Sequence, residues 1–183
     1  MRRYTQIALL GSIAFLFFAY LEIPRGFFLP FLKYDLGDVP ALIATFALGP
    51  VPGIAVELIK GLLAAVFTFK EHGPFGILMN TLAGVSFVGI AGGYYLVEHT
   101  KAGAIKSLTF GTMTMTAVMI VANVFLTPLF FPGFSRSQVV AWIFPALLPF
   151  NLLKGTVDAL ITYLVYKRVR VHLYEWIGDR TAW

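Results

Sequence analysis

Three polar side chains interrupt the last long apolar stretch of the sequence at a spacing that places them on one side of a helix. Asn151, Lys154 and Asp158 occupy positions i, i+3 and i+7, which share a helical face. An ionisable group at the centre of a bilayer costs at least about 2.5 to 3.5 kcal/mol on insertion scales. Such a residue is therefore expected to have a functional or structural role. Lys154 and Asp158 can neutralise each other, which would leave Asn151 and part of Lys154 for a ligand. The alternative is an ion pair that only holds helices together.

A second set of polar residues follows helical spacing on the preceding apolar stretch and should face inward. Its members are Thr109, Thr112, Thr116, Asn123 and Thr127. Threonines in membrane helices often serve only as interhelical contacts. Asn123 differs because a buried amide carries two donors and an acceptor that need partners, so it is a candidate for ligand binding.

Small residues and one amide recur every four positions on a further stretch, at Gly76, Asn80 and Gly84. A face with so little bulk permits close helix packing or contact with a flat ligand. Glu57 and Lys60, three residues apart, are interpreted as an internal ion pair. The string ELIKG at 57–61 is faintly similar to NLLKG at 151–155, which suggests an inverted repeat but is too short to establish one.

The segment 25–40 is too apolar for an ordinary exposed loop and too rich in glycine and proline for a membrane span. It contains the polar triplet Lys33, Tyr34 and Asp35. We expect it to act as a lid that folds over the mouth of the bundle and closes it on an aromatic ligand. A loop that rests among lipid headgroups is the alternative.

Patterns of catalysis and of metal binding are missing from the sequence. The three histidines, His72, His99 and His172, are scattered, and no zinc-protease or phosphate-binding loop motif occurs. Cysteine is absent, which excludes disulfides and thiolate metal sites. We therefore expect no enzyme, no cofactor and no metal, and if the chain drives uptake, the energy must come from elsewhere.

The composition identifies the bilayer as the solvent of this chain. Of its 183 residues, 58% are hydrophobic and 13% charged, whereas soluble domains are about 45 to 50% apolar and about 25% charged. Apolar runs predict an all-α membrane protein with six transmembrane helices in one domain, 1–183. The expected spans are 5–23, 38–48, 52–69, 75–97, 107–127 and 140–166, with 49–53 as a tight turn. The basic start resembles a signal peptide, but without a cleavage site we expect it to remain as the first span.

The net charge of +5 is explained by membrane topology, and nucleic acid is not an expected partner because the basic residues form no patch with interleaved aromatics. Six spans with both termini cytoplasmic place eight basic residues inside and four outside, in agreement with the positive-inside rule. The inner set is Arg2, Arg3, Lys101, Lys106, Lys167, Arg168, Arg170 and Arg180, and the outer set is Arg25, Lys33, Lys70 and Arg136.

Three strings in the sequence resemble one family of membrane proteins. They are KYDLGDVP at 33–40, GPFGILMN at 73–80 and LPFNLLKG at 148–155, and they are similar to those of the riboflavin-specific substrate-binding subunits, or S components, of energy-coupling-factor (ECF) importers. The resemblance implies a six-helix protein of the prokaryotic cell membrane that binds riboflavin as its transported substrate. It also implies docking on a transmembrane coupling protein that carries two ATPase subunits.

The resemblance also implies roles for individual residues. Riboflavin has a flat tricycle, a pyrimidine edge of carbonyls with an N–H, and a neutral hydroxylated tail. The implied ligand-binding set is Lys33, Tyr34, Asp35, Asn80, Gly84, Asn123, Asn151 and Lys154, with Gly84 giving a ring face room. A small-residue pattern at Ala8, Gly11 and Ser12 matches the one that meets the coupling protein in this family, with serine in place of the second alanine.

Two alternatives to the riboflavin reading stay open at the level of the sequence. The ligand could be another vitamin or a flavin nucleotide, although a phosphate would require more cationic partners near the mouth than Lys33, Arg25 and Arg136 supply. The chain could also be a structural subunit without a ligand, in which case Asn151, Lys154 and Asp158 would serve helix packing alone.

Overall fold

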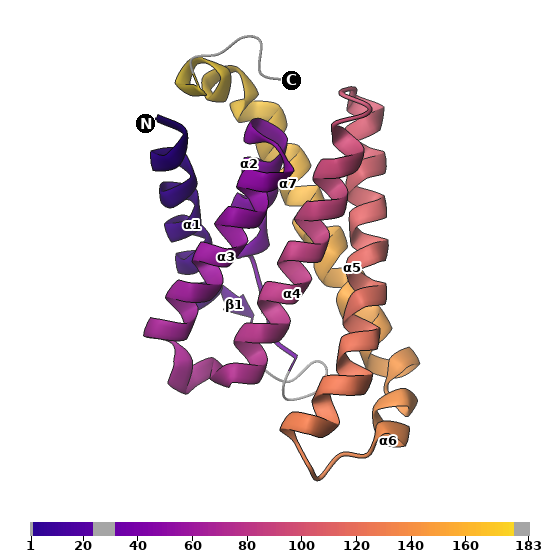
Figure 1. Cartoon of the computed structure of the whole chain (residues 1–183). Coiled ribbons are helices and arrows are strands. Elements are labelled where there is room, and N and C mark those ends of the chain that lie inside the picture. The colour runs from indigo at the N-terminus through magenta and orange to yellow at the C-terminus, as the bar shows by residue number, and fades with distance from the viewer. Residues whose placement is uncertain (1, 24–31, 178–183) are drawn as a thin grey trace.

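The computed structural model describes residues 2–23 and 32–177, and its long helices stand side by side in a bundle (Figure 1). In chain order the elements are α1 (Arg2–Tyr20), β1 (Glu22–Ile23), β2 (Tyr34–Asp35), α2 (Asp38–Leu48), α3 (Pro50–Phe67), α4 (Phe69–Tyr95), α5 (Lys101–Phe130), α6 (Arg136–Ala141), the π-helical turn η1 (Ile143–Leu147) and α7 (Leu148–Ile177). The beginning of α1 and the end of α7 lie at the same end of the bundle (Figure 1).

Within the described residues, five helical segments are long and apolar enough to cross a membrane, and α2 is a shorter apolar helix. This confirms the prediction of a helical, multi-pass membrane protein, in which five of the six predicted spans are long enough for a full crossing. The 11 residues of α2 span about 16 Å at 1.5 Å per residue, roughly half of the hydrocarbon core of about 30 Å. The second predicted span therefore has the predicted bounds but only half the length of a crossing.

The connection between α2 and α3 is shorter than the five-residue turn predicted from the sequence. Gly49 alone leaves the helical conformation, with φ at 101°, a value that favours glycine. Pro50 then begins α3, because its fixed φ and missing N–H suit a first helical position. The two helices pack closely, since a Cβ on Gly53 of α3 would overlap the Thr45 side chain of α2.

The last predicted span, 140–166, begins at the end of α6, continues through η1 and lies mostly in α7. Ser135 and Gln138 form a capping box that starts α6, a motif that satisfies free N–H groups at a helix N-terminus. Pro145 lies within η1 and Pro149 follows at the start of α7. Proline has no N–H to donate, and π-helical turns accommodate such interruptions.

A similar interruption divides α4. Gly73 has φ at 66° and Pro74 follows it inside the helix, so the regular part of α4 begins close to position 75, where the fourth span was predicted to start. The sequence signal at this boundary is the Gly-Pro pair, which cannot continue a helix without a break.

The chain enters the bundle through a short antiparallel pairing of β1 and β2, in which Glu22 faces Asp35 and Ile23 faces Tyr34. Residues 24–31 of the expected lid lie outside the described residues. The remainder differs from the expectation, because Asp35 is only 1% exposed and Asp38 is completely buried. The segment 35–40 therefore belongs to the interior and continues directly into α2.

The other end of α2 is held by aromatic packing. The Phe46 ring lies 4.7 Å from that of Tyr95 and 5.5 Å from that of Tyr166 between centroids, and the Tyr166 hydroxyl donates to the Phe46 carbonyl at 3.2 Å. Offset and edge contacts of this kind contribute beyond the burial of their area. They fix α2 against α4 and α7, so the position of Asp38 at its beginning is also fixed.

Candidate ligand-binding site

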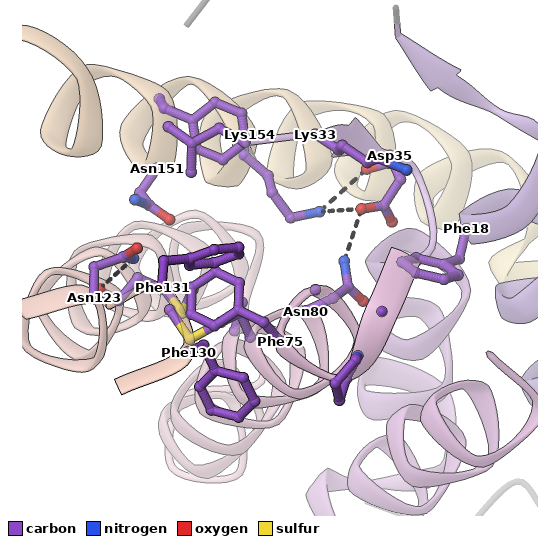
Figure 2. Close-up of a pocket in the computed structure, with 18 residues that line it drawn as sticks. Phe18, Lys33, Asp35, Phe75, Asn80, Asn123, Phe130, Phe131, Asn151 and Lys154 are labelled. Carbon is purple, nitrogen blue, oxygen red and sulfur yellow. Dashed lines mark hydrogen bonds and ion pairs between the residues drawn. The ribbon is translucent and has the colours of Figure 1, made fainter. Parts of the chain in front are cut away.

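A cavity of about 480 Å³ lies among α1, the segment before α2, α4, α5 and α7 (Figure 2). This volume is within the range of about 300 to 1,000 Å³ that is usual for small-molecule sites. The lining residues are Phe18, Leu32, Lys33, Asp35, Gly73, Pro74, Phe75, Gly76, Met79, Asn80, Ala83, Met119, Asn123, Phe130, Phe131, Phe150, Asn151 and Lys154. The wall is therefore mainly aromatic and apolar, with a small number of polar groups.

Aromatic rings from two helices form one side of the cavity. The Phe75 ring of α4 lies 5.4 Å from that of Phe130, the last residue of α5, and 5.1 Å from that of Phe131, which follows it (Figure 2). Met79 and Met119 complete this apolar wall; methionine adapts its shape and makes favourable contacts with aromatic rings. Such a wall suits a flat, conjugated ligand.

Three amide side chains reach the cavity from three different helices. Asn123 of α5 donates to the Met119 carbonyl at 2.8 Å, and Asn151 of α7 donates to the Leu147 carbonyl at 2.7 Å. Asn80 of α4 donates to Oδ2 of Asp35 at 2.7 Å. Each amide nitrogen carries two hydrogens, so each retains a second N–H for a ligand, and these internal bonds orient the amides in advance.

The ammonium group of Lys154 lies at the polar end of the cavity, where it reaches toward Asp35 (Figure 2). It donates to the Asp35 carbonyl at 3.1 Å and lies 3.5 Å from Oδ2 of the same residue. It also lies 3.0 Å from Oδ2 of Asp38 and 3.3 Å from Oδ2 of Asp158. The predicted pair of Lys154 and Asp158 is therefore present as one part of a larger cluster.

This cluster extends behind the cavity wall to α3. Lys60 lies 2.5 Å from Oδ1 of Asp38 and 2.7 Å from Oε2 of Glu57, so the predicted pair of Glu57 and Lys60 is also present. All these side chains are almost completely buried. We call the six residues Asp35, Asp38, Glu57, Lys60, Lys154 and Asp158 the charge cluster. It contains four carboxyl groups and two ammonium groups, and only Asp35 and Lys154 line the cavity.

Six of the eight ligand-binding residues predicted from the sequence line the cavity, namely Lys33, Asp35, Asn80, Asn123, Asn151 and Lys154. Tyr34 does not; its hydroxyl donates to Oδ1 of Asp158 at 3.0 Å, and its ring lies under the Lys154 ammonium. Gly84 is also outside the lining, because it faces α3, where a Cβ would overlap the Glu57 carboxylate. The space that Gly84 leaves is therefore occupied by a buried side chain of the protein.

The predicted inward stripe on α5 holds for four of its five members, whereas Thr109 is exposed and donates to the Ile105 carbonyl of its own helix. Sequence reasoning assigned no role to Asp38 or to the phenylalanines of the wall. Asp38 lies within the string KYDLGDVP, and an acidic residue at the first position of an apolar helix was the available signal. The phenylalanines could not be distinguished from others among the 18 in the chain.

The three residues predicted to meet a coupling protein lie on α1 but face in different directions. Ala8 and Ser12 are exposed, and the Ser12 hydroxyl donates to the Ala8 carbonyl at 2.9 Å. Gly11 is buried, and a Cβ there would overlap Ile59 of α3. The small residue at position 11 thus serves the contact between α1 and α3, and the outer surface is formed by Ala8 and Ser12.

The chain matches the family model described as ECF transporter, substrate-specific component, over residues 2–166. It is 35% identical to the riboflavin transporter RibU of Staphylococcus aureus over 173 residues, which are 92% of this chain and 90% of that protein. It is 32% identical to the riboflavin transporter FmnP of Bacillus subtilis over 188 residues, covering 99% of this chain and 96% of that protein.

A solved structure is similar across almost the same length. It is described as the S component of a bacterial ECF transporter, and it aligns with a TM-score of 0.79 and 36% sequence identity over 93% of this chain and 96% of that chain.

Proposed function

The chain belongs to the family of substrate-specific components of ECF transporters, and we propose that it captures riboflavin in the cavity described above for import. It is a transporter subunit rather than an enzyme, and riboflavin is its substrate and not a cofactor. The observation that carries the proposal is the lining of the cavity, in which three oriented amides, two lysines and one carboxylate interrupt a mainly aromatic and apolar wall.

The chemistry of riboflavin is complementary to this lining. Its tricyclic ring offers two flat apolar faces, which suit contact with Phe75, Phe131 and Met119. Its pyrimidine edge presents carbonyl acceptors and an N–H donor, which suit the amides of Asn123 and Asn151. The number of polar groups is small, as expected for a site that uses apolar contact for affinity and hydrogen bonds for orientation.

The charges around the cavity favour a neutral ligand over a nucleotide. Lys33 is paired with Glu22 at 3.1 Å, and Lys154 is surrounded by Asp35, Asp38 and Asp158. Because both lysines near the cavity already have carboxylate partners, neither offers an uncompensated positive charge to a phosphate. This supports riboflavin over its phosphorylated form as the substrate.

The proposed partner is an ECF module that consists of a transmembrane coupling protein and two ATPases. The exposed pair Ala8 and Ser12 on α1 supports docking there, because small side chains allow a helix of the partner to approach closely. The distribution of basic residues supports cytoplasmic termini, in the plasma membrane of a prokaryote. We further propose that residues 1–183 form one membrane domain.

The first test is a titration of the detergent-purified protein with riboflavin, followed by quenching of flavin fluorescence. The expected result is stoichiometric quenching, together with a visible flavin spectrum if vitamin is retained during purification. Lys106→Met is a matched control because Lys106 is exposed and pairs with Glu98 away from the cavity; its affinity should equal that of the wild type. A colourless protein that does not quench riboflavin would refute the assignment of the ligand.

A further inference from the structure

Asp38 lies outside the cavity, yet it contacts the cavity lysine more closely than the other carboxylates do. Its Oδ2 is 3.0 Å from the Lys154 ammonium, compared with 3.3 Å for Asp158 and 3.5 Å for Asp35. Its Oδ1 lies 2.5 Å from Lys60 of α3. One carboxylate therefore joins two buried ammonium groups from two helices, with a separate oxygen for each.

The other two carboxylates near Lys154 are occupied by different partners. Oδ1 of Asp35 accepts from the Gly37 N–H at 2.9 Å, and its Oδ2 accepts from Asn80 at 2.7 Å. Oδ1 of Asp158 accepts from the Tyr34 hydroxyl at 3.0 Å. The carboxylates of Asp35 and Asp158 thus also accept hydrogen bonds from groups other than lysine. Each oxygen of Asp38, in contrast, forms an ion pair with a lysine.

The direction of these contacts determines where the Lys154 ammonium lies. A lysine side chain has a flexible four-carbon stem, and much rotamer freedom is lost when its head is fixed. Asp158 is on the same helix, at i+4, and does not line the cavity, so pairing with it alone would draw the ammonium along α7. Asp38 approaches from α2, beside the Asp35 carbonyl that accepts from Lys154 at 3.1 Å, and both oppose that attraction.

We propose that Asp38 is a positioning residue of the ligand site, which holds the Lys154 ammonium at the cavity wall and anchors it to Lys60 of α3. This inference rests on the proposed function, since the ligand used to test it is riboflavin. Asp38 itself does not touch the ligand; it acts through Lys154.

The first experiment compares Asp38→Asn with Glu57→Gln by riboflavin titration of purified protein. Both changes remove one buried carboxylate of the charge cluster and keep the shape of the side chain, but Glu57 contacts Lys60 and not Lys154. We expect Asp38→Asn to weaken riboflavin binding by at least about tenfold, the usual scale for a displaced charged donor. Glu57→Gln should weaken it much less, because Glu57 is connected to Lys154 only through Lys60 and Asp38.

The second experiment separates positioning from a general effect on folding. In a Lys154→Met background the ammonium is absent, so adding Asp38→Asn should not weaken binding further, whereas effects of independent sites add. Additive losses, or wild-type affinity in Asp38→Asn alone, would overturn the proposal. If Asp38→Asn does not give folded protein, Asp38→Glu keeps the charge but moves the carboxylate by one methylene, and it is used in the same two backgrounds with the same criteria.

The wild-type titration distinguishes the failure of this inference from the failure of the proposed function. Absence of riboflavin binding by the wild type would overturn both. Tight binding by the wild type with equal affinity in Asp38→Asn would retain riboflavin as the substrate and remove Asp38 from the site.

Discussion

Replacing Gly84 by alanine separates a role in ligand binding from a role in helix packing. A Cβ at this position would overlap both carboxylate oxygens of Glu57, and Glu57 cannot move freely because Oε2 lies 2.7 Å from the buried Lys60 ammonium. We therefore expect Gly84→Ala to lower stability, while the affinity of the folded fraction for riboflavin stays within about twofold of the wild type.

The magnitude follows from two opposing contributions. Overpacking of a close-packed interior costs about 1 to 3 kcal/mol, and the overlap with a salt-bridged carboxylate places this case at about 2 to 3 kcal/mol. Alanine is favoured over glycine in a helix by about 0.5 to 1 kcal/mol, which leaves a net loss of roughly 1 to 2.5 kcal/mol. At about 2 to 4 °C per kcal/mol for a chain of this size, Tm should fall by roughly 2 to 10 °C.

Gly93→Ala is the matched control for this measurement. Gly93 is on the same helix, is exposed, and has no atom within 4 Å of an added Cβ, so only the gain in helix propensity applies and its Tm should not fall. The assay is thermal unfolding in detergent, followed by riboflavin titration of each variant. An unchanged Tm in Gly84→Ala would refute the packing argument. A tenfold loss of affinity together with an unchanged Tm would also indicate that Gly84 contacts the ligand.

Three further predictions concern separate parts of the molecule. Asn151→Leu keeps the shape of the side chain but removes its amide, so riboflavin Kd should rise about tenfold or more, and an unchanged Kd in the same titration would contradict a ligand role. Ser12→Leu should spare binding to the purified protein yet block uptake into cells, because a bulky residue prevents close helix approach; normal uptake would show that docking occurs elsewhere. The hydrogen bond from Lys106 lowers the pKa of Glu98, so this exposed pair stabilises the fold above the ordinary carboxyl pKa, and the contribution disappears as pH falls through the lowered value. Melting curves of Lys106→Met and wild type should therefore differ little at neutral pH, as for other screened surface pairs, and converge in acid; a large difference at neutral pH would show that the pair has a structural role.

Much of the fold could be predicted because membrane helices have strong sequence signals. The lengths of the apolar runs predicted where the membrane helices lie. The bounds 38–48 of α2 were correct because Gly37 precedes this helix, and Gly49 and Pro50 follow it. The interruption of the last span was missed, since the end of α6 and the whole of η1 lie within one continuous apolar stretch. Hydropathy does not distinguish a short helix at the mouth from the first turns of a span.

The polar residues of the site could be predicted because the bilayer makes each of them costly. Their partners could not, because periodicity relates residues of one helix only. Lys154 and Asp158 were paired by their spacing, but the approach of Asp35 and Asp38 depends on how the chain enters the bundle after β2. Gly84 was misjudged for the same reason: the sequence shows that space exists at that position but not which neighbour fills it.

The half-length of α2 has an electrostatic consequence. The first turn of any helix leaves its N–H groups without intrahelical partners and carries a partial positive charge of about half a unit. In α2 this turn begins at Asp38, inside the bundle, where the charge cluster has more carboxyl groups than ammonium groups. A helix that crossed the whole bilayer would place its positive end at the aqueous surface, too far away to act on these carboxylates. By beginning inside the bundle, α2 directs the positive end of its macrodipole at the carboxyl groups of the charge cluster and favours the ionised form of Asp38, which lies in its own first turn.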